Sequence, residues 1–300
     1  MDSAFRDAIR GLSALKEEPI ECKAEEGCRP LAFAPERFKA ISPAKGRILF
    51  LDGGSQEILA TPAFTICSVR VAWALFDGKK KVAHEKKDYQ LLMAEEPRLF
   101  PPEAAFPKDF SLDECRRRLE LQAAIASVTL LRQGDVLCLD GSLVPKAEKR
   151  LMAELAGSCQ DRGIALLGFC KSSGLLTANG NPFGFALDAK APARAWQYFP
   201  CQDFPLGQSI VGTGFAKFHP KAKPFRFDTS SPECISLIAS HCNDPAFLGY
   251  PYGLVDADRH ARISFKEAEQ QRLLLRLRLP ELRALAKDAH QGLDSLNKPR

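Results

Sequence analysis

Two aspartates in this sequence each end an apolar run and are each followed by glycine. Asp52 follows the run 47–51, and Asp140 follows the run 136–139. A carboxylate at the end of an apolar strand is held on a rigid element, and the glycine lets another group approach closely. Two such carboxylates on neighbouring strands can share a hard divalent cation such as Mg²⁺ or Mn²⁺. An Asp-Gly pair can also simply start a turn, as we expect at residues 77–78, so either pair alone fits both interpretations.

Glu120 and Lys171 could join these carboxylates. Glu120 lies on a predicted helix that carries only small residues at 123, 124 and 127, so this helix can sit close to a sheet. The alternative for Glu120 is a surface ion pair with Arg116, one helical turn earlier. Lys171 directly follows the apolar run 164–170 and could offset charge on a phosphate, or it could be an ordinary solvated lysine.

A third acidic group lies at the start of a late predicted helix and contains Asp256, Asp258 and His260. Acidic residues there also favour the helix dipole, which is the alternative explanation. Asp256 and Asp258 point about 200° apart on a helix, so they cannot face the same metal. Asp258 lies beside the small residues Ala257 and Ala261, so we choose Asp258 as the candidate and expect Asp256 to be exposed. His260 remains a candidate proton carrier.

Aromatic and basic side chains alternate between residues 215 and 227. Rings that stack on bases and cations that pair with phosphates suit single-stranded nucleic acid. A phenylalanine at every second position is equally typical of a half-buried strand. The candidate DNA-binding residues are Lys217, Phe218, Lys221, Lys223 and Arg226.

The elements that must position these residues follow the order β-β-β-α-β-α-β. Ser111 and Glu114 form a capping box at the start of the first long helix. The apolar run 164–170 predicts a central strand that is covered on both faces. The predicted strands are 47–51, 64–76, 80–93, 136–139 and 164–170, with helices at 111–132 and 145–161. Further strands are predicted near 209–218 and 225–227, and helices near 232–242, 253–263, 265–279 and after 280.

Composition allows a folded chain with a substantial core. The sequence has 300 residues, of which 45% are hydrophobic and 26% charged, and this excludes disorder over most of its length. No apolar run approaches the roughly 18 residues of a membrane span, and charged residues interrupt the N-terminus where a signal peptide would be apolar. None of the ten cysteines forms a CxxC pair, so we expect reduced thiols and a cytoplasmic protein. A net charge of +5 permits a nucleic-acid partner without requiring one.

The order and spacing of these motifs resemble the NurA family of nucleases. The resemblance covers residues 46–270 and includes the sequences around Asp52, Glu120, Asp140 and Lys171, and the segment 249–262. It implies an α/β fold with an RNase H-like mixed sheet flanked by helices and additional C-terminal helices. Residues 1–45 would be an N-terminal helix and lead-in segment, 271–300 a helical tail, and 174–230 an insertion that matches the family poorly.

The resemblance also implies an activity and partners. These are a manganese- or magnesium-dependent nuclease with 5′→3′ exonuclease and single-strand endonuclease activity, a homodimer, and a HerA-type hexameric helicase as partner. The implied process is DNA end resection and repair, on single-stranded and end-resected double-stranded DNA. The implied metal ligands are Asp52, Glu120, Asp140 and Asp258, and the implied basic active-site residue is Lys171.

Two other classes share part of this pattern. An actin-like or sugar-kinase-type ATP-binding phosphotransferase has the same element order, and the sequence 212–214 (Gly-Thr-Gly) could form its second phosphate loop. Such proteins usually need two domains of this kind, and a carboxylate at position 120 has no obvious role in them. A non-catalytic helicase partner subunit would have no chemical reason to retain Asp52, Glu120 and Asp140 together.

Overall fold

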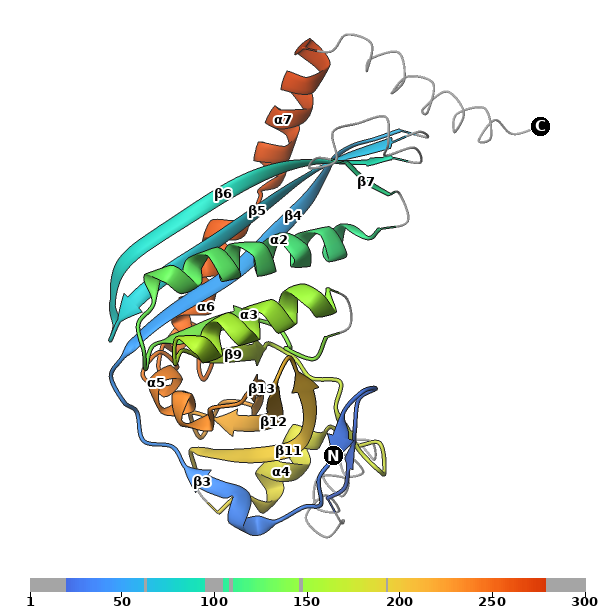
Figure 1. Cartoon of the computed structure of the whole chain (residues 1–300). Coiled ribbons are helices and arrows are strands. Elements are labelled where there is room, and N and C mark those ends of the chain that lie inside the picture. The colour runs from blue at the N-terminus through green and yellow to red at the C-terminus, as the bar shows by residue number, and fades with distance from the viewer. Residues whose placement is uncertain are drawn as a thin grey trace, which may run out of the picture. The chain divides into compact units, whose positions relative to one another are not determined.

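The predicted element order from residue 47 to residue 170 is confirmed in the computed structural model (Figure 1). The additions to that order among the described residues are a short strand, β7 (Ala105–Pro107), and a 3-10 helix, η3 (Val128–Leu130). This is the RNase H-like order that the sequence predicts. Its elements are β4 (Arg47–Ala60), β5 (Phe64–Asp77), β6 (Lys80–Ala94), α2 (Leu112–Ser127), β8 (Val136–Asp140), α3 (Lys149–Asp161) and β9 (Ala165–Cys170).

The structure describes residues 20–61, 64–94, 105–107, 110–145, 148–192 and 194–278. The predictions for the N-terminal helix, for most of the Pro-rich loop and for the chain after 278 lie outside these residues. The chain forms two compact units. The first contains the described residues of 1–51, 74–84 and 124–256, and the second those of 52–73, 85–123 and 257–300. The division at residues 45 and 270 stays a prediction.

In the first unit, β8 lies between β4 and β9 and runs parallel to both. Leu51 of β4 pairs with Leu139 of β8, which in turn pairs with Gly168 of β9. The side chains of residues 136–139 are fully buried, as expected for a parallel strand covered on both faces. The sheet continues antiparallel from β9 through β13 (Phe225–Thr229), β12 (Ser209–Lys217) and β11 (Trp196–Leu206) to β2 (Arg29–Pro30).

Strands β10 (Leu176–Thr177) and β11 and helix α4 (Phe183–Lys190) are the elements of the insertion that the sequence pattern missed. Pro200 and Pro205 interrupt the pattern of β11, and its pairing with β12 is irregular between Tyr198 and Gln202. The Phe183, Trp196 and Tyr198 side chains of α4 and β11 are buried in one hydrophobic cluster with Phe215 of β12. Strand β3 (Phe38–Ala40) pairs with β11, and β1 (Cys22–Lys23) pairs with β10. The short helices η4 (Pro232–Cys234) and α5 (Ile235–Ala239) also belong to this unit.

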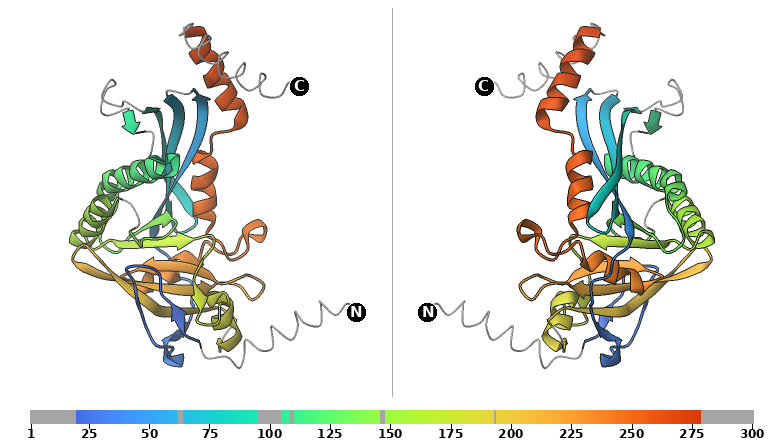
Figure 2. Two further views of the ribbon diagram at one scale, coloured as in Figure 1. Left: turned by 90° about the vertical axis from the view of Figure 1, so that its right-hand side faces the viewer. Right: turned by 90° about the vertical axis from the view of Figure 1, so that its left-hand side faces the viewer.

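The second unit contains the remaining parts of β4, β5 and β6 together with β7, most of α2, the end of α6 (Tyr252–Ala261) and α7 (Phe265–Arg278). The capping box at α2 is confirmed, because Ser111 Oγ accepts a hydrogen bond from the Glu114 backbone N–H and Glu114 Oε2 accepts one from the Ser111 N–H. Figure 2 shows α7 beside the end of β4, where Arg272 Nε donates to the Ile58 carbonyl at 2.6 Å.

All ten cysteines are free thiols, and nine of them are buried. Burial raises the pKa of Cys67 and of Cys159 to about 12, so these thiols behave as small apolar side chains at neutral pH. Among the described residues, no helix is long and apolar enough to span a membrane.

Candidate active site

Asp52 is the first residue of the second unit and is 7% exposed. Its Oδ1 accepts a hydrogen bond from the Gly53 backbone N–H at 2.8 Å. A Cβ atom on Gly53 would lie 2.5 Å from Glu120 Oε1, which is closer than real Cβ contacts allow. Gly53 is therefore required for α2 to place the Glu120 carboxylate against β4, directly beyond Asp52.

Glu120 is buried, and its side chain is only 2% exposed. It pairs with Arg116, and its Oε2 lies 3.1 Å from Arg117 Nη1. The predicted ion pair with Arg116 is present. The prediction that this pair lies at the surface was wrong, because Gly53 lets the helix approach the strand and Glu120 is buried. Burial lowers the pKa of Arg116, yet carboxylates in this unit, Asp52 among them, raise the pKa more, so it lies above its usual value.

The end of α6 contacts β4 at the second glycine of the same motif. A Cβ atom on Gly54 would lie 2.3 Å from the Ala261 carbonyl oxygen. Asp258 lies one turn earlier on α6, with its side chain 34% exposed and its Oδ2 3.0 Å from Arg262 Nη2. The second unit thus holds Asp52, Glu120 and Asp258 on elements that meet at the two glycines.

Asp256 is buried in the first unit, so the prediction that it is exposed was wrong. It is 5% exposed, and its Oδ2 accepts a hydrogen bond from Lys81 Nζ at 2.9 Å. The reason is the packing of α6, because a Cβ atom on Gly253 would lie 2.0 Å from the Phe50 ring and Asp256 is about 60° from Gly253 around the helix. The prediction of an exposed helix start, favoured by the helix dipole, did not include the contact between Gly253 and Phe50. His260 is half-buried.

Asp140 ends β8 in the first unit, where Lys171 and Tyr250 contact its carboxylate. Its Oδ2 lies 2.5 Å from Lys171 Nζ, and its Oδ1 accepts a hydrogen bond from Tyr250 Oη at 3.3 Å. Lys171 directly follows β9, the strand that pairs with β8, and its side chain is 50% exposed. Tyr250 is held against the rings of Phe169 and Phe225, 5.6 and 5.5 Å away between centroids. Asp140 and Lys171 therefore form an ion pair, as adjacent strand ends would predict.

Tyr250 is a residue of this cluster to which the sequence analysis gave no role. It lies inside the segment 249–262, directly before Pro251. The signal was available, because an aromatic hydroxyl next to a predicted helix start can reach a neighbouring strand end. What was missing was the contact across 110 positions of sequence between Tyr250 and Asp140.

Only part of the basic and aromatic stretch is exposed. Arg226 and Phe218 are buried, at 3% and 8% exposure, and all residues of β13 are buried, so this strand is fully buried, whereas the alternative predicts a half-buried one. Lys217 Nζ lies 2.7 Å from Asp188 Oδ2 and is also largely buried. Lys221 and Lys223 are exposed. These two lysines remain available to a nucleic acid without any rearrangement of the sheet.

The Gly-Thr-Gly sequence at 212–214 is not a phosphate loop. It lies inside β12, where all three residues are buried. A Cβ atom on Gly212 would lie 2.4 Å from the Phe199 ring, and one on Gly214 would lie 2.6 Å from the Phe227 ring. These glycines make room for aromatic rings, so the feature that favoured a kinase-like phosphotransferase has a packing explanation.

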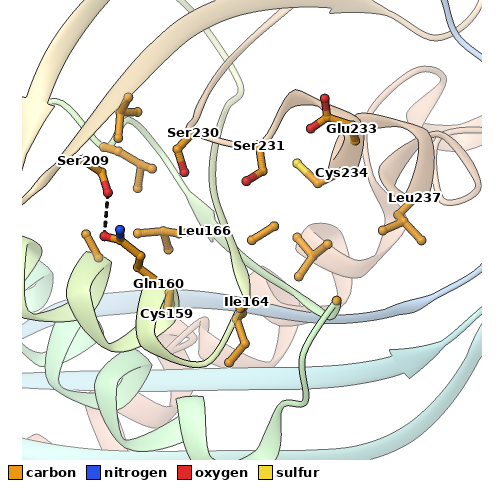
Figure 3. Close-up of a pocket in the computed structure, with 17 residues that line it drawn as sticks. Cys159, Gln160, Ile164, Leu166, Ser209, Ser230, Ser231, Glu233, Cys234 and Leu237 are labelled. Carbon is orange, nitrogen blue, oxygen red and sulfur yellow. Dashed lines mark hydrogen bonds between the residues drawn. The ribbon is translucent and has the colours of Figure 1, made fainter.

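A cavity of about 400 Å³ lies elsewhere in the first unit, between α3, the start of β9 and the η4–α5 segment (Figure 3). Its walls are largely apolar, and at its edge Ser209 Oγ donates a hydrogen bond to Gln160 Oε1 at 2.7 Å. Its lining contains none of the predicted site residues.

The donors of the predicted site residues suit hard metal ions. Asp52, Glu120, Asp140 and Asp258 offer carboxylate oxygens without cysteine, which favours Mg²⁺ or Mn²⁺ over zinc. Arginine and lysine side chains offset the charge of Glu120 and Asp140. Within the described part of the chain, no group of three or more His, Cys, Asp or Glu side chains is assembled as a metal site.

Comparison with known proteins supports the motif-based resemblance. The model of the NurA domain family matches residues 46–263. The chain belongs to the NurA domain family. Its fold is similar to that of the NurA nuclease from Sulfolobus solfataricus, with a TM-score of 0.57 and 14% identity over 94% of this chain and 98% of that one.

A second crystal structure of NurA aligns with a TM-score of 0.54 and 9% identity, over 88% of this chain and 94% of that one. At these identities the two structures establish the shared fold. The curated protein sequences gave no match. The RNase H-like α/β fold and the NurA family are thus confirmed, and roles for individual residues rest on the geometry described above.

Proposed function

We propose that this NurA-domain protein is a nuclease that hydrolyses DNA phosphodiester bonds with the help of divalent metal ions. The observation that carries the proposal is the placement of Asp52 and Asp140 directly after Leu51 and Leu139, which pair with each other in parallel strands. Family membership and the fold shared with a NurA nuclease support the same assignment. The proposal gives both carboxylates a part in one reaction.

Mn²⁺ or Mg²⁺ fits the donor set, with Asp52, Glu120, Asp140 and Asp258 as the residues that would hold it. When bound, such an ion lowers the pKa of a bound water and neutralises charge on the phosphate. The protein's contribution is orientation. Gly53 brings Glu120 against β4, and Tyr250 donates a hydrogen bond that orients the Asp140 carboxylate.

In this proposal Lys171 interacts with the DNA phosphate as well as with Asp140. Its ammonium group lies 2.5 Å from Asp140 Oδ2, and half of its side chain faces solvent. A cation at that place can offset the negative charge that grows on a phosphate during hydrolysis. Lys221 and Lys223, both exposed, would attract the DNA backbone.

The type of cleavage, the DNA substrates and the partners that we propose follow from the family resemblance. We include in the proposal a 5′→3′ exonuclease and single-strand endonuclease activity, on single-stranded and end-resected double-stranded DNA. We also include a homodimer and action with a HerA-type hexameric helicase during DNA end resection and repair in the cytoplasm.

Digestion of end-labelled single-stranded DNA by the full chain tests the proposal. We expect shortened products with Mn²⁺ and none when EDTA removes the metal. Products labelled at the 5′ end and at the 3′ end distinguish the polarity of cleavage. Intact DNA over a range of Mn²⁺ and Mg²⁺ concentrations would contradict the nuclease assignment, and saturable ATP binding under those conditions would favour the phosphotransferase.

A further inference from the structure

Asp228 is a fully buried carboxylate that binds the loop after Asp140. It lies in β13 and is 0% exposed. Its Oδ2 accepts hydrogen bonds from Ser142 Oγ at 2.6 Å and from the Leu143 backbone N–H at 3.0 Å. Bonds to an ionised carboxylate are the stronger kind of hydrogen bond. Asp228 therefore holds the two residues that lie two and three positions after Asp140.

Gly168 gives the loop its path to Asp228. In the sheet, Gly168 of β9 pairs with Leu139 on one side and with Asp228 on the other. A Cβ atom on Gly168 would lie 2.7 Å from the Gly141 carbonyl oxygen and 3.0 Å from the Leu143 backbone nitrogen. The loop thus crosses β9 where that strand has no side chain. Any other residue at 168 would push the loop away from Asp228.

Arg226 and Glu25 complete the buried network. Arg226 is 3% exposed, and its Nε lies 3.1 Å from Asp228 Oδ1. Its Nη2 lies 2.8 Å from Glu25 Oε2 and donates to Ser142 Oγ at 3.1 Å. Ser142 Oγ also accepts a hydrogen bond from the Val144 N–H at 3.0 Å. The serine hydroxyl is therefore fixed by one acceptor and two donors.

Stability alone does not explain this network. Burying an ion pair carries a desolvation penalty that often exceeds the attraction between the charges, and apolar residues of similar volume are commonly as stable. The network does, however, fix the backbone next to a carboxylate whose position decides metal binding. Partners that orient a metal ligand affect metal affinity or activity about 10–100-fold when they are removed.

We propose that Asp228 and Arg226 are positioning residues that act through Ser142 to fix the direction of the Asp140 carboxylate. The inference rests on the proposed nuclease function. Neither residue contacts the substrate in this account. Arg226, a DNA-binding candidate by sequence pattern, instead acts from inside the sheet.

The kinetic test compares Ser142→Ala and Asp228→Asn with the wild-type chain. We expect cleavage to fall about 10–100-fold at a fixed low Mn²⁺ concentration, with the Mn²⁺ half-saturation raised and the KM for DNA nearly unchanged. Ser209→Ala is the matched control, because it removes a serine hydrogen bond to Gln160 in the same unit. Wild-type kinetics and Mn²⁺ half-saturation in Ser142→Ala, which is a small change that should fold, would overturn the proposal.

Hydrogen exchange separates this inference from the nuclease assignment. The Leu143 amide donates to a buried carboxylate, so exchange of the peptide spanning 141–144 should be slow in the wild type and faster in Asp228→Asn. Unchanged exchange in a folded Asp228→Asn chain would overturn the proposal that Asp228 fixes the loop after Asp140, even if the wild type cleaves DNA. Faster exchange together with an inactive wild type would contradict the proposed function instead.

Discussion

Glu120 is held between two guanidinium groups on one helix, so its charge is offset although its side chain is buried. Burying a carboxylate carries a desolvation penalty, and the loss of one arginine would leave part of its charge uncompensated. Arg116 and Arg117 are themselves partly exposed, at 28% and 21% of their side chains. Both arginines can therefore be hydrated if the Glu120 carboxylate binds a metal ion instead.

Glu120→Gln should abolish metal-dependent cleavage while the chain stays folded. Glutamine keeps the shape of the side chain and loses the ligand charge, and the two arginines can be hydrated, so we expect a loss of about 1–3 kcal/mol of unfolding free energy. Asp113→Asn on the same helix is the control, because its side chain is 83% exposed. Full activity of Glu120→Gln with Mn²⁺ would reduce Glu120 to a structural ion pair.

At the scale of elements, β4 does not end at residue 51 as the sequence predicted but continues to Ala60, so Asp52, Gly53 and Gly54 lie inside the strand. The two glycines let α2 and α6 reach β4 directly beyond Asp52. The sequence predicted that glycine would permit a close approach and named Glu120 as a group that could reach the carboxylates, but it did not predict the contact between Gly54 and the Ala261 carbonyl. Contacts at such separations depend on how helices pack, and packing leaves little trace in a local pattern.

Gly54→Ala should destabilise the chain. The added Cβ would lie 2.3 Å from a backbone carbonyl of α6, which cannot rotate away, so we expect a loss of about 1–3 kcal/mol in denaturant unfolding. Gly157→Ala in α3 is the matched control. No atom lies within 4 Å of that position, so the same change should stabilise the helix by about 0.5–1 kcal/mol. Equal effects at the two positions would show that α6 does not pack on β4 as described.

His241 couples the packing of the α5 segment to pH. Its ring lies 5.1 Å from the Phe50 ring and 5.3 Å from the Phe76 ring, and its Nε2 is buried without a hydrogen-bond partner among the described residues. Burial lowers its pKa to about 4. The unfolded chain then binds more protons between pH 6.5 and pH 4, so His241 is neutral and tolerated above pH 6.5 and destabilises the fold as pH falls through that window.

We expect this group to remove about 2 kcal/mol of unfolding free energy between pH 7 and pH 5. His241→Phe keeps an aromatic ring between Phe50 and Phe76 and has no proton to bind. The difference between the two unfolding free energies should therefore grow in favour of the variant as pH falls. Parallel pH profiles for the variant and the wild type would contradict the buried neutral histidine.

At the scale of the whole molecule, the element order and the NurA family were predictable from sequence, because β8 and β9 are short apolar runs and the motif order is characteristic. The insertion was less predictable. Pro200 and Pro205 interrupt the strand pattern of β11, so this strand was not predicted. The alternation of aromatic and basic residues in 215–227 fits a buried Arg226 as well as a DNA-binding one. Asp256 was misplaced because its burial follows from the packing of Gly253 against the ring of Phe50, a residue far away in the sequence.

Lys221 and Lys223 should contribute to the salt dependence of DNA binding. Each lysine that pairs with a phosphate releases a counterion, so replacing both with glutamine should lower the slope of log K against log salt by about 1–2. Lys217→Gln is the control, since Lys217 already pairs with Asp188 and should change the slope little. An unaltered slope in the double variant would place the DNA on another surface.

The rate of DNA cleavage by Asp140→Asn at saturating Mn²⁺ tests the central claim most directly. Its matched control is Asp161→Asn, an exposed aspartate at the end of α3 in the same unit. We predict that Asp140→Asn folds like the wild type and cleaves end-labelled single-stranded DNA more than about 100-fold more slowly, because a metal ligand has lost its charge. Asp161→Asn should cleave at the wild-type rate. Wild-type cleavage by a folded Asp140→Asn chain would contradict the claim that the carboxylates of Asp52, inside β4, and Asp140, at the end of β8, act in the reaction.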